Sequence, residues 1–201
     1  MNDESAKHFL HRLEAFSDIV IGFSLAQLGA VLVIPDHAIT LVAHPQWLFG
    51  FALAFSVVCS MWFFHHRLFA GFFIPKPLPV ILNFLWLAIV VLLVYATQLY
   101  VRSMSDLVAV RMYYIAYSLA YGILGIQYLI AARIGANRAG AYRGAVFTFL
   151  WTAPFVVCLV ATSIFPPDSV NAATGAVFAL TIAAFFVLAR RYRRPSAGSG
   201  A

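Results

Sequence analysis

The sequence predicts an all-α integral membrane protein, and three observations lead to that fold class. Of its 201 residues, 63% are hydrophobic and 10% are charged, whereas soluble domains average about 45–50% apolar and about 25% charged residues. The apolar residues gather in six runs, each long enough for a helix to cross a bilayer. Most of the 13 basic residues stand between these runs or near their ends, so the net charge of +6 indicates membrane topology and not a nucleic-acid partner.

Proline and glycine separate the six predicted helices. Pro35 follows the first run, and Pro45 opens the second at a position where a helix tolerates proline. The segment 74–79 contains three prolines, which fix φ and remove donors, so a stiff connector precedes the third helix. The glycine-containing segment 133–140 precedes the fifth, and Pro166-Pro167 precedes the sixth. The predicted helices cover residues 10–34, 46–69, 78–101, 107–132, 144–165 and 170–189.

The distribution of basic residues predicts the orientation of the chain. We expect residues 1–195 to form one six-helix transmembrane domain and residues 196–201 to form a disordered tail. Six spans place both termini on one side. Only Arg102 and Arg111 fall on the opposite side; the side of the termini holds Lys7, Arg12, Arg67, Lys76, Arg133, Arg138, Arg143, Arg190, Arg191, Arg193 and Arg194. This bias predicts a multi-pass protein of the cell membrane with both termini cytoplasmic.

The first helix is the candidate functional element, because it holds polar groups at bilayer depth. A charge or amide there costs a few kcal/mol on insertion scales, so such residues face a bundle interior or a water-filled path. At 100° per residue, five residues fall within a sector of about 60°. They are Arg12, Phe16, Phe23, Gln27 and Ala30. This stripe favours a pore wall; alternatively, the two phenylalanines are bundle core and Gln27 is an interhelical hydrogen bonder.

Asp18 needs a cationic or hydrogen-bonding partner in the membrane. The expected partners lie near the end of the second helix, in the segment 62–67, and at Asn83 on the third; alternatively, Asp18 pairs only with Arg12. His65 and His66 are adjacent, hence about 100° apart on a helix, so the pair does not form a metal site. We expect one buried histidine to donate to a carboxylate. The chain has no phosphate loop, nucleophile elbow or zincin spacing, so no enzyme, cofactor or metal is predicted.

Three segments resemble a known family. Arg12 followed by Phe16-Ser17-Asp18 is similar to the signature at the head of the first helix in the lysosomal potassium channel called transmembrane protein 175 and its prokaryotic relatives. Trp62 with His65 resembles the family's Trp-x-x-His segment, and Leu82-Asn83-Phe84-Leu85 resembles its Leu-Asn-Leu-Leu segment. The matches cover the first half of the chain, and the last three helices match in number and length.

The resemblance implies a prokaryotic-type member with six helices per subunit, assembled as a homotetramer around a central pore lined by the first helix. It implies passive conduction of K⁺ or other monovalent cations through a hydrophobic constriction. It also implies an interhelical polar network that holds the first helix, formed by Arg12, Phe16, Ser17, Asp18, Trp62, His65 and Asn83.

The pore positions depart from the family's pattern. In the family, bulky aliphatic side chains narrow the pore five, nine and twelve residues after the motif aspartate. The corresponding residues here are Phe23, Gln27 and Ala30, of which only Phe23 is both bulky and apolar. An apolar ring excludes water, whereas a ring of amides supplies oxygens and keeps the site wet. We therefore expect Phe23 to form the tight apolar point and Gln27 to form a polar ring one turn outward.

Two other functions stay open at the level of the sequence. In a proton-linked or small-solute carrier, Asp18, His65 and Asn83 would transfer protons instead of holding the first helix in place. In a non-conducting membrane subunit, the substituted pore positions would carry no ions. The expected partners are other copies of the chain, the lipid bilayer and monovalent cations.

Overall fold

The computed structural model describes residues 3–29, 45–103, 105–135 and 137–193. Within these residues the structure contains six α-helices and no strand, which confirms the all-α fold with six helices. The helices are α1 (Asp3–Gly29), α3 (Pro45–Gly71), α4 (Pro77–Arg102), α5 (Leu107–Ile134), α6 (Arg138–Ala161) and α7 (Pro167–Arg193).

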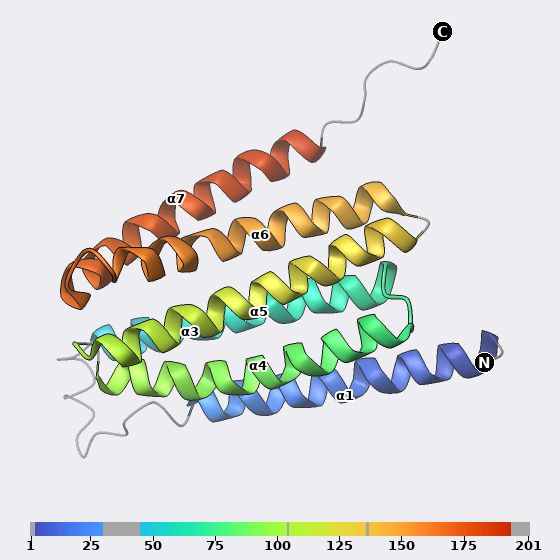
Figure 1. The fold of residues 1–201 in the computed structure, drawn as a ribbon, viewed down its shortest axis with the longest axis horizontal. Coiled ribbons are helices and arrows are strands. Elements are labelled where there is room, and N and C mark those ends of the chain that lie inside the picture. The colour runs from blue at the N-terminus through green and yellow to red at the C-terminus, as the bar shows by residue number, and fades with distance from the viewer. Residues whose placement is uncertain (1–2, 30–44, 104, 136, 194–201) are drawn as a thin grey trace, which may run out of the picture.

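Successive helices run in opposite directions through an elongated bundle (Figure 1). α1 lies beside α4, α4 beside α5, and α5 beside α6, while α7 packs on the outer side of α6 (Figure 1). The start of α1 and the end of α7 lie at the same end of the bundle. Four helices in the described part of the chain are long and apolar enough to cross a membrane: α4, α5, α6, and α7 from Pro167 to Leu188.

The observed ends of the helices differ from the predicted ones for identifiable reasons. α1 begins at Asp3 because its polar first turns continue the helix beyond the apolar run. α6 begins at Arg138, where the Asn137 Oδ1 atom accepts a hydrogen bond of 3.0 Å from the Gly140 N–H. The predicted stretch 30–34 of the first helix and the tail 196–201 lie outside the described residues.

α5 forms the centre of the bundle, because its tyrosines join it to other helices. Tyr121 and Tyr128 are almost fully buried, and each hydroxyl donates to a backbone carbonyl of α3, that of Val57 at 3.1 Å and that of Phe64 at 2.7 Å. In return, the Trp86 Nε1–H of α4 donates to the Ala120 carbonyl at 2.9 Å. A buried polar tip without a partner costs about 1–3 kcal/mol, so these bonds select one packing of the apolar helices.

A glycine on α6 permits close contact between α5 and α6. A Cβ atom added at Gly144 would overlap the ring of Tyr128, which the bond to Phe64 holds in place. At Gly175 on α7, by contrast, an added Cβ atom would meet no atom within 4 Å. The absence of a side chain therefore matters at Gly144 and not at Gly175.

We predict that Gly144→Ala destabilises the protein by about 1–3 kcal/mol, the range for overpacking a filled site. The apparent Tm in detergent should fall by about 2–4 °C for each kcal/mol lost. Gly175→Ala is the matched control and should leave Tm unchanged or slightly higher. Equal Tm values for the two variants would contradict the packing described for Tyr128.

Candidate functional site

A chain of buried hydrogen bonds joins α1 to α4 and α3. The Asn83 Nδ2 group of α4 donates to the Ser17 Oγ atom of α1 at 3.1 Å. The Asn83 Oδ1 atom lies 2.9 Å from the His65 Nε2 atom of α3. All three side chains are fully buried. One amide thus bridges two helices, using its donor toward one and its acceptor toward the other.

The geometry around Asn83 defines the protonation of His65. Because the Asn83 Oδ1 atom is an acceptor, the His65 Nε2 atom carries the proton and donates it. The ring is held between Trp86, stacked at 4.5 Å and 6°, and Phe69, also at 4.5 Å. Among the described residues, the Nδ1 atom has no hydrogen-bond partner. The ring is therefore a fixed, neutral hydrogen-bond donor.

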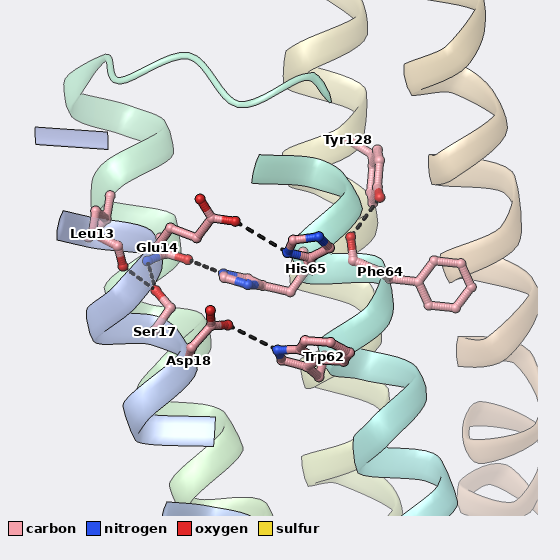
Figure 2. Close-up of polar contacts among 10 residues, drawn as sticks. Leu13, Glu14, Ser17, Asp18, Trp62, Phe64, His65 and Tyr128 are labelled. Atoms are coloured by element: carbon pink, nitrogen blue, oxygen red, sulfur yellow. Dashed lines mark hydrogen bonds and ion pairs between the residues drawn. The ribbon is translucent and has the colours of Figure 1, made fainter. Parts of the chain in front are cut away.

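A second set of polar contacts joins α1 to α3 closer to the surface. The Trp62 Nε1–H donates to the Asp18 Oδ1 atom at 2.9 Å, and the two side chains point toward each other from facing helices (Figure 2). The Glu14 Oε1 atom lies 3.3 Å from the His66 Nδ1 atom. The Trp62 and His66 rings stack with centroids 5.6 Å apart. Four residues thus form a paired contact between one turn of α1 and one turn of α3.

These contacts confirm one expectation and correct another. The hydrogen-bond partner of Asp18 is Trp62, which belongs to the expected segment 62–67, and not Arg12. The buried histidine, which was expected to donate to a carboxylate, donates to the Asn83 amide. The reason is the 100° angle between adjacent residues, which aims His65 at α4 and His66 at α1. Arg67 points elsewhere, with its guanidinium 5.7 Å from the Phe63 ring centroid.

Sequence reasoning missed Glu14. The signal was present, because Glu14 and Asp18 are four residues apart on α1, as Trp62 and His66 are on α3. Residues at this spacing lie on one face of a helix. On antiparallel neighbouring helices, two such pairs can contact each other residue by residue. A partner for Asp18 in the second helix therefore implied a second contact one turn away, at Glu14.

Arg12 and Phe16 lie outside these hydrogen-bonded sets. Both are exposed and line an open cavity of about 910 Å³ near the start of α1. Phe16 contacts Phe84 of α4, with ring centroids 6.1 Å apart. In the described part of the chain, we find no hydrogen bond or ion pair to Arg12. The structure therefore brings Ser17, Asp18, Trp62, His65 and Asn83 into polar contacts and leaves Arg12 beside the cavity.

The predicted pore positions lie on the face of α1 that the other described helices leave uncovered. Phe23 is 65% exposed, and Gln27 is exposed as well. On the opposite face, Ile21, Ser24 and Leu28 are buried against the bundle. Ala30 lies outside the described residues. The described residues contain no cluster of three or more His, Cys, Asp or Glu side chains suited to a metal ion.

Part of this chain is similar to a known family of membrane channels. Residues 12–94 match the model of the endosomal/lysosomal potassium channel TMEM175. This stretch contains all the polar contacts between α1, α3 and α4 described above. The match covers less than half of the chain, and it supports the resemblance to TMEM175 over residues 12–94. The resemblance stated from the three sequence segments is therefore confirmed. A search of curated proteins finds no significant match.

Two solved structures share the fold over most of the chain. A lysosomal potassium-selective channel TMEM175 homolog from Chamaesiphon Minutus is similar at 21% identity, with a TM-score of 0.72 over 90% of this chain and 97% of that one. A variant of the potassium channel MtTMEM175, solved with a nanobody fusion protein, is similar at 17% identity, with a TM-score of 0.65 over 90% and 92%. At these identities the likeness shows the fold, and it extends the TMEM175 arrangement beyond residue 94.

We predict that Asn83→Ala destabilises the protein by about 1–3 kcal/mol or more, because it leaves His65 and Ser17 buried without their shared partner. The change should appear as a lower apparent Tm in detergent. Gln98→Ala is the control, since Gln98 also lies on α4 and has no hydrogen bond to another described side chain. A Tm for Asn83→Ala equal to that of the control would show that the buried chain does not hold α1.

Proposed function

We propose that the protein is a potassium-permeable cation channel, in which four copies surround a central pore lined by α1. The observation that carries the proposal is the division of α1 into two faces. Ser17, Ile21, Ser24 and Leu28 are buried against its own subunit, while the face with Phe23 is left uncovered. A helix anchored on one side by buried hydrogen bonds and uncovered on the other suits a pore wall. The match of residues 12–94 to the TMEM175 model and the two potassium-channel neighbours support the same function.

Phe23 and Gln27 divide the proposed pore into two zones. Four Phe23 rings around a common axis form an apolar constriction, which gates by excluding water. Gln27 lies one turn farther along α1. Four amides there supply oxygens to an ion that has shed part of its hydration shell. Conduction is passive and involves no catalysis, and the protein resides in the cell membrane with both termini cytoplasmic.

The buried contacts favour a channel over a proton-linked carrier. A relay through Asp18, His65 and Asn83 needs a continuous path of proton donors and acceptors. Asp18 bonds to Trp62, whose indole N–H donates only and passes no proton onward. His65 and Asn83 form a separate chain that continues through the Ser17 hydroxyl to the Leu13 carbonyl. These residues therefore hold the helices together.

Potassium and sodium flux in liposomes tests this function. Purified full-length protein should raise K⁺ flux above that of protein-free liposomes, without saturation and without coupling to a proton gradient. The mass of the detergent-solubilised protein should correspond to four subunits. Saturable, proton-coupled flux would identify a carrier, and an absence of flux beside an active family member would identify a non-conducting subunit.

We predict opposite effects of substitutions in the two zones. Phe23→Ala removes the apolar constriction, so planar-bilayer conductance should rise several-fold and the preference for K⁺ over Na⁺ should fall. Gln27→Leu removes the amide oxygens and excludes water from the ring, so conductance should fall several-fold. Val187→Ala and Gln98→Leu are the controls, because they make similar changes on α7 and α4. Unchanged conductance and selectivity in both pore variants would overturn the assignment of these positions.

A further inference from the structure

A second cavity lies at the basic end of the bundle, away from α1. Its volume is about 550 Å³, and it opens between the end of α3 and the start of α6, with α5 and α7 contributing to its walls. The residues that line it include Arg67 and Arg143 and no acidic residue. Nothing in the proposed conduction path involves this cavity.

Two glycines and two aromatic rings that contact each other line part of the cavity. Gly140 and Gly144 stand one turn apart on α6, where an added Cβ atom would collide with Phe72 and with Tyr128 respectively. The Tyr128 hydroxyl donates to the Phe64 carbonyl at 2.7 Å, so its ring is fixed. The rings therefore press against the α6 backbone, and the shape of the cavity is set by packed groups.

The charge of the cavity comes from two helices that converge at its opening. Arg67 belongs to the last turns of α3, and Arg143 to the first turns of α6. The Arg67 guanidinium lies 5.7 Å from the Phe63 ring centroid, which restricts its position. Guanidinium groups bind phosphate oxygens in a bidentate way, and two of them at one opening favour a phosphate over a single carboxylate.

The apolar walls indicate what else the ligand contains. Phe63, Phe147 and Phe185 line the cavity beside the two arginines. The next residue on α7, Phe186, is also apolar and 60% exposed, and its ring contacts that of Phe185. The cavity is thus bordered by a surface suited to acyl chains, while its arginines suit a headgroup. Basic pockets between membrane helices bind anionic headgroups in this manner.

We propose that this cavity binds an anionic phospholipid, with the headgroup phosphate between Arg67 and Arg143 and an acyl chain along the phenylalanines. The site belongs to one subunit and is independent of ion conduction. It is a lipid site because soluble phosphate would use the arginines and leave the aromatic walls without a partner.

Native mass spectrometry of the full-length protein in detergent tests the site with phosphatidylglycerol, phosphatidylcholine and inorganic phosphate as probes. Wild-type protein should retain phosphatidylglycerol in preference to phosphatidylcholine, and millimolar phosphate should not displace it. The double variant Arg67→Gln with Arg143→Gln should weaken phosphatidylglycerol binding about tenfold or more, since each basic residue near an anionic headgroup contributes about 1 kcal/mol. The charge-retaining variant Arg67→Lys with Arg143→Lys should recover part of the loss.

Arg133→Gln with Arg138→Gln is the matched control, because it removes two charges near the α5–α6 connection that do not line the cavity. Equal losses of phosphatidylglycerol binding in the two glutamine variants would overturn the site, because they would indicate general electrostatic attraction between the basic residues and the lipid. Displacement by phosphate would overturn the lipid assignment in favour of a soluble anion. The lipid preference and the phosphate competition are measured on wild-type protein, so a variant that fails to fold does not prevent the test.

Discussion

The rest of the structure depends on one constraint, which is that the polar groups buried between α1, α3 and α4 must satisfy each other. The Asn83 amide meets this constraint by donating to Ser17 and accepting from His65. Lipid tails are as apolar as the helices, so apolar packing alone does not select the rotation of α1 about its axis. The hydrogen bond from Asn83 to Ser17 selects this rotation. Once Ser17 faces inward, Ser24 and Leu28 follow, and Phe23 and Gln27 remain on the uncovered face.

The bundle combines this hydrogen-bonded helix with a tightly packed scaffold. On the scaffold side, buried tyrosines of α5 donate to carbonyls of α3, and Gly144 allows the Tyr128 ring to contact α6. The scaffold therefore fixes α3, and α3 in turn presents His65 and Trp62 to α1. The same Tyr128 ring also forms a wall of the basic cavity, so the position of the proposed lipid site and the position of α1 both depend on α3.

The sequence was sufficient to predict the fold class and most of the residues that meet at the site, but not their pairing. Runs of apolar residues depend only on length and composition, so six helices were predictable. Which side chains meet depends on the rotation and register of neighbouring helices. Neither quantity can be derived from the sequence of one helix alone. For this reason the sequence limited the partner of Asp18 to the segment 62–67 and Asn83, and only the structure identifies it as Trp62. Glu14 was missed because its pairing with His66 becomes visible only when α1 and α3 are aligned.

The central claim is that the uncovered face of α1 lines the conduction path. Its most direct test is block by a charged thiol reagent, measured as potassium current through Gln27→Cys in a background with Cys59 and Cys158 changed to serine. Val187→Cys on the exposed surface of α7 is the control. Our account predicts that labelling abolishes most of the current through Gln27→Cys and leaves the control unchanged. Complete labelling of Gln27→Cys, verified by intact mass, with an unchanged current would contradict it.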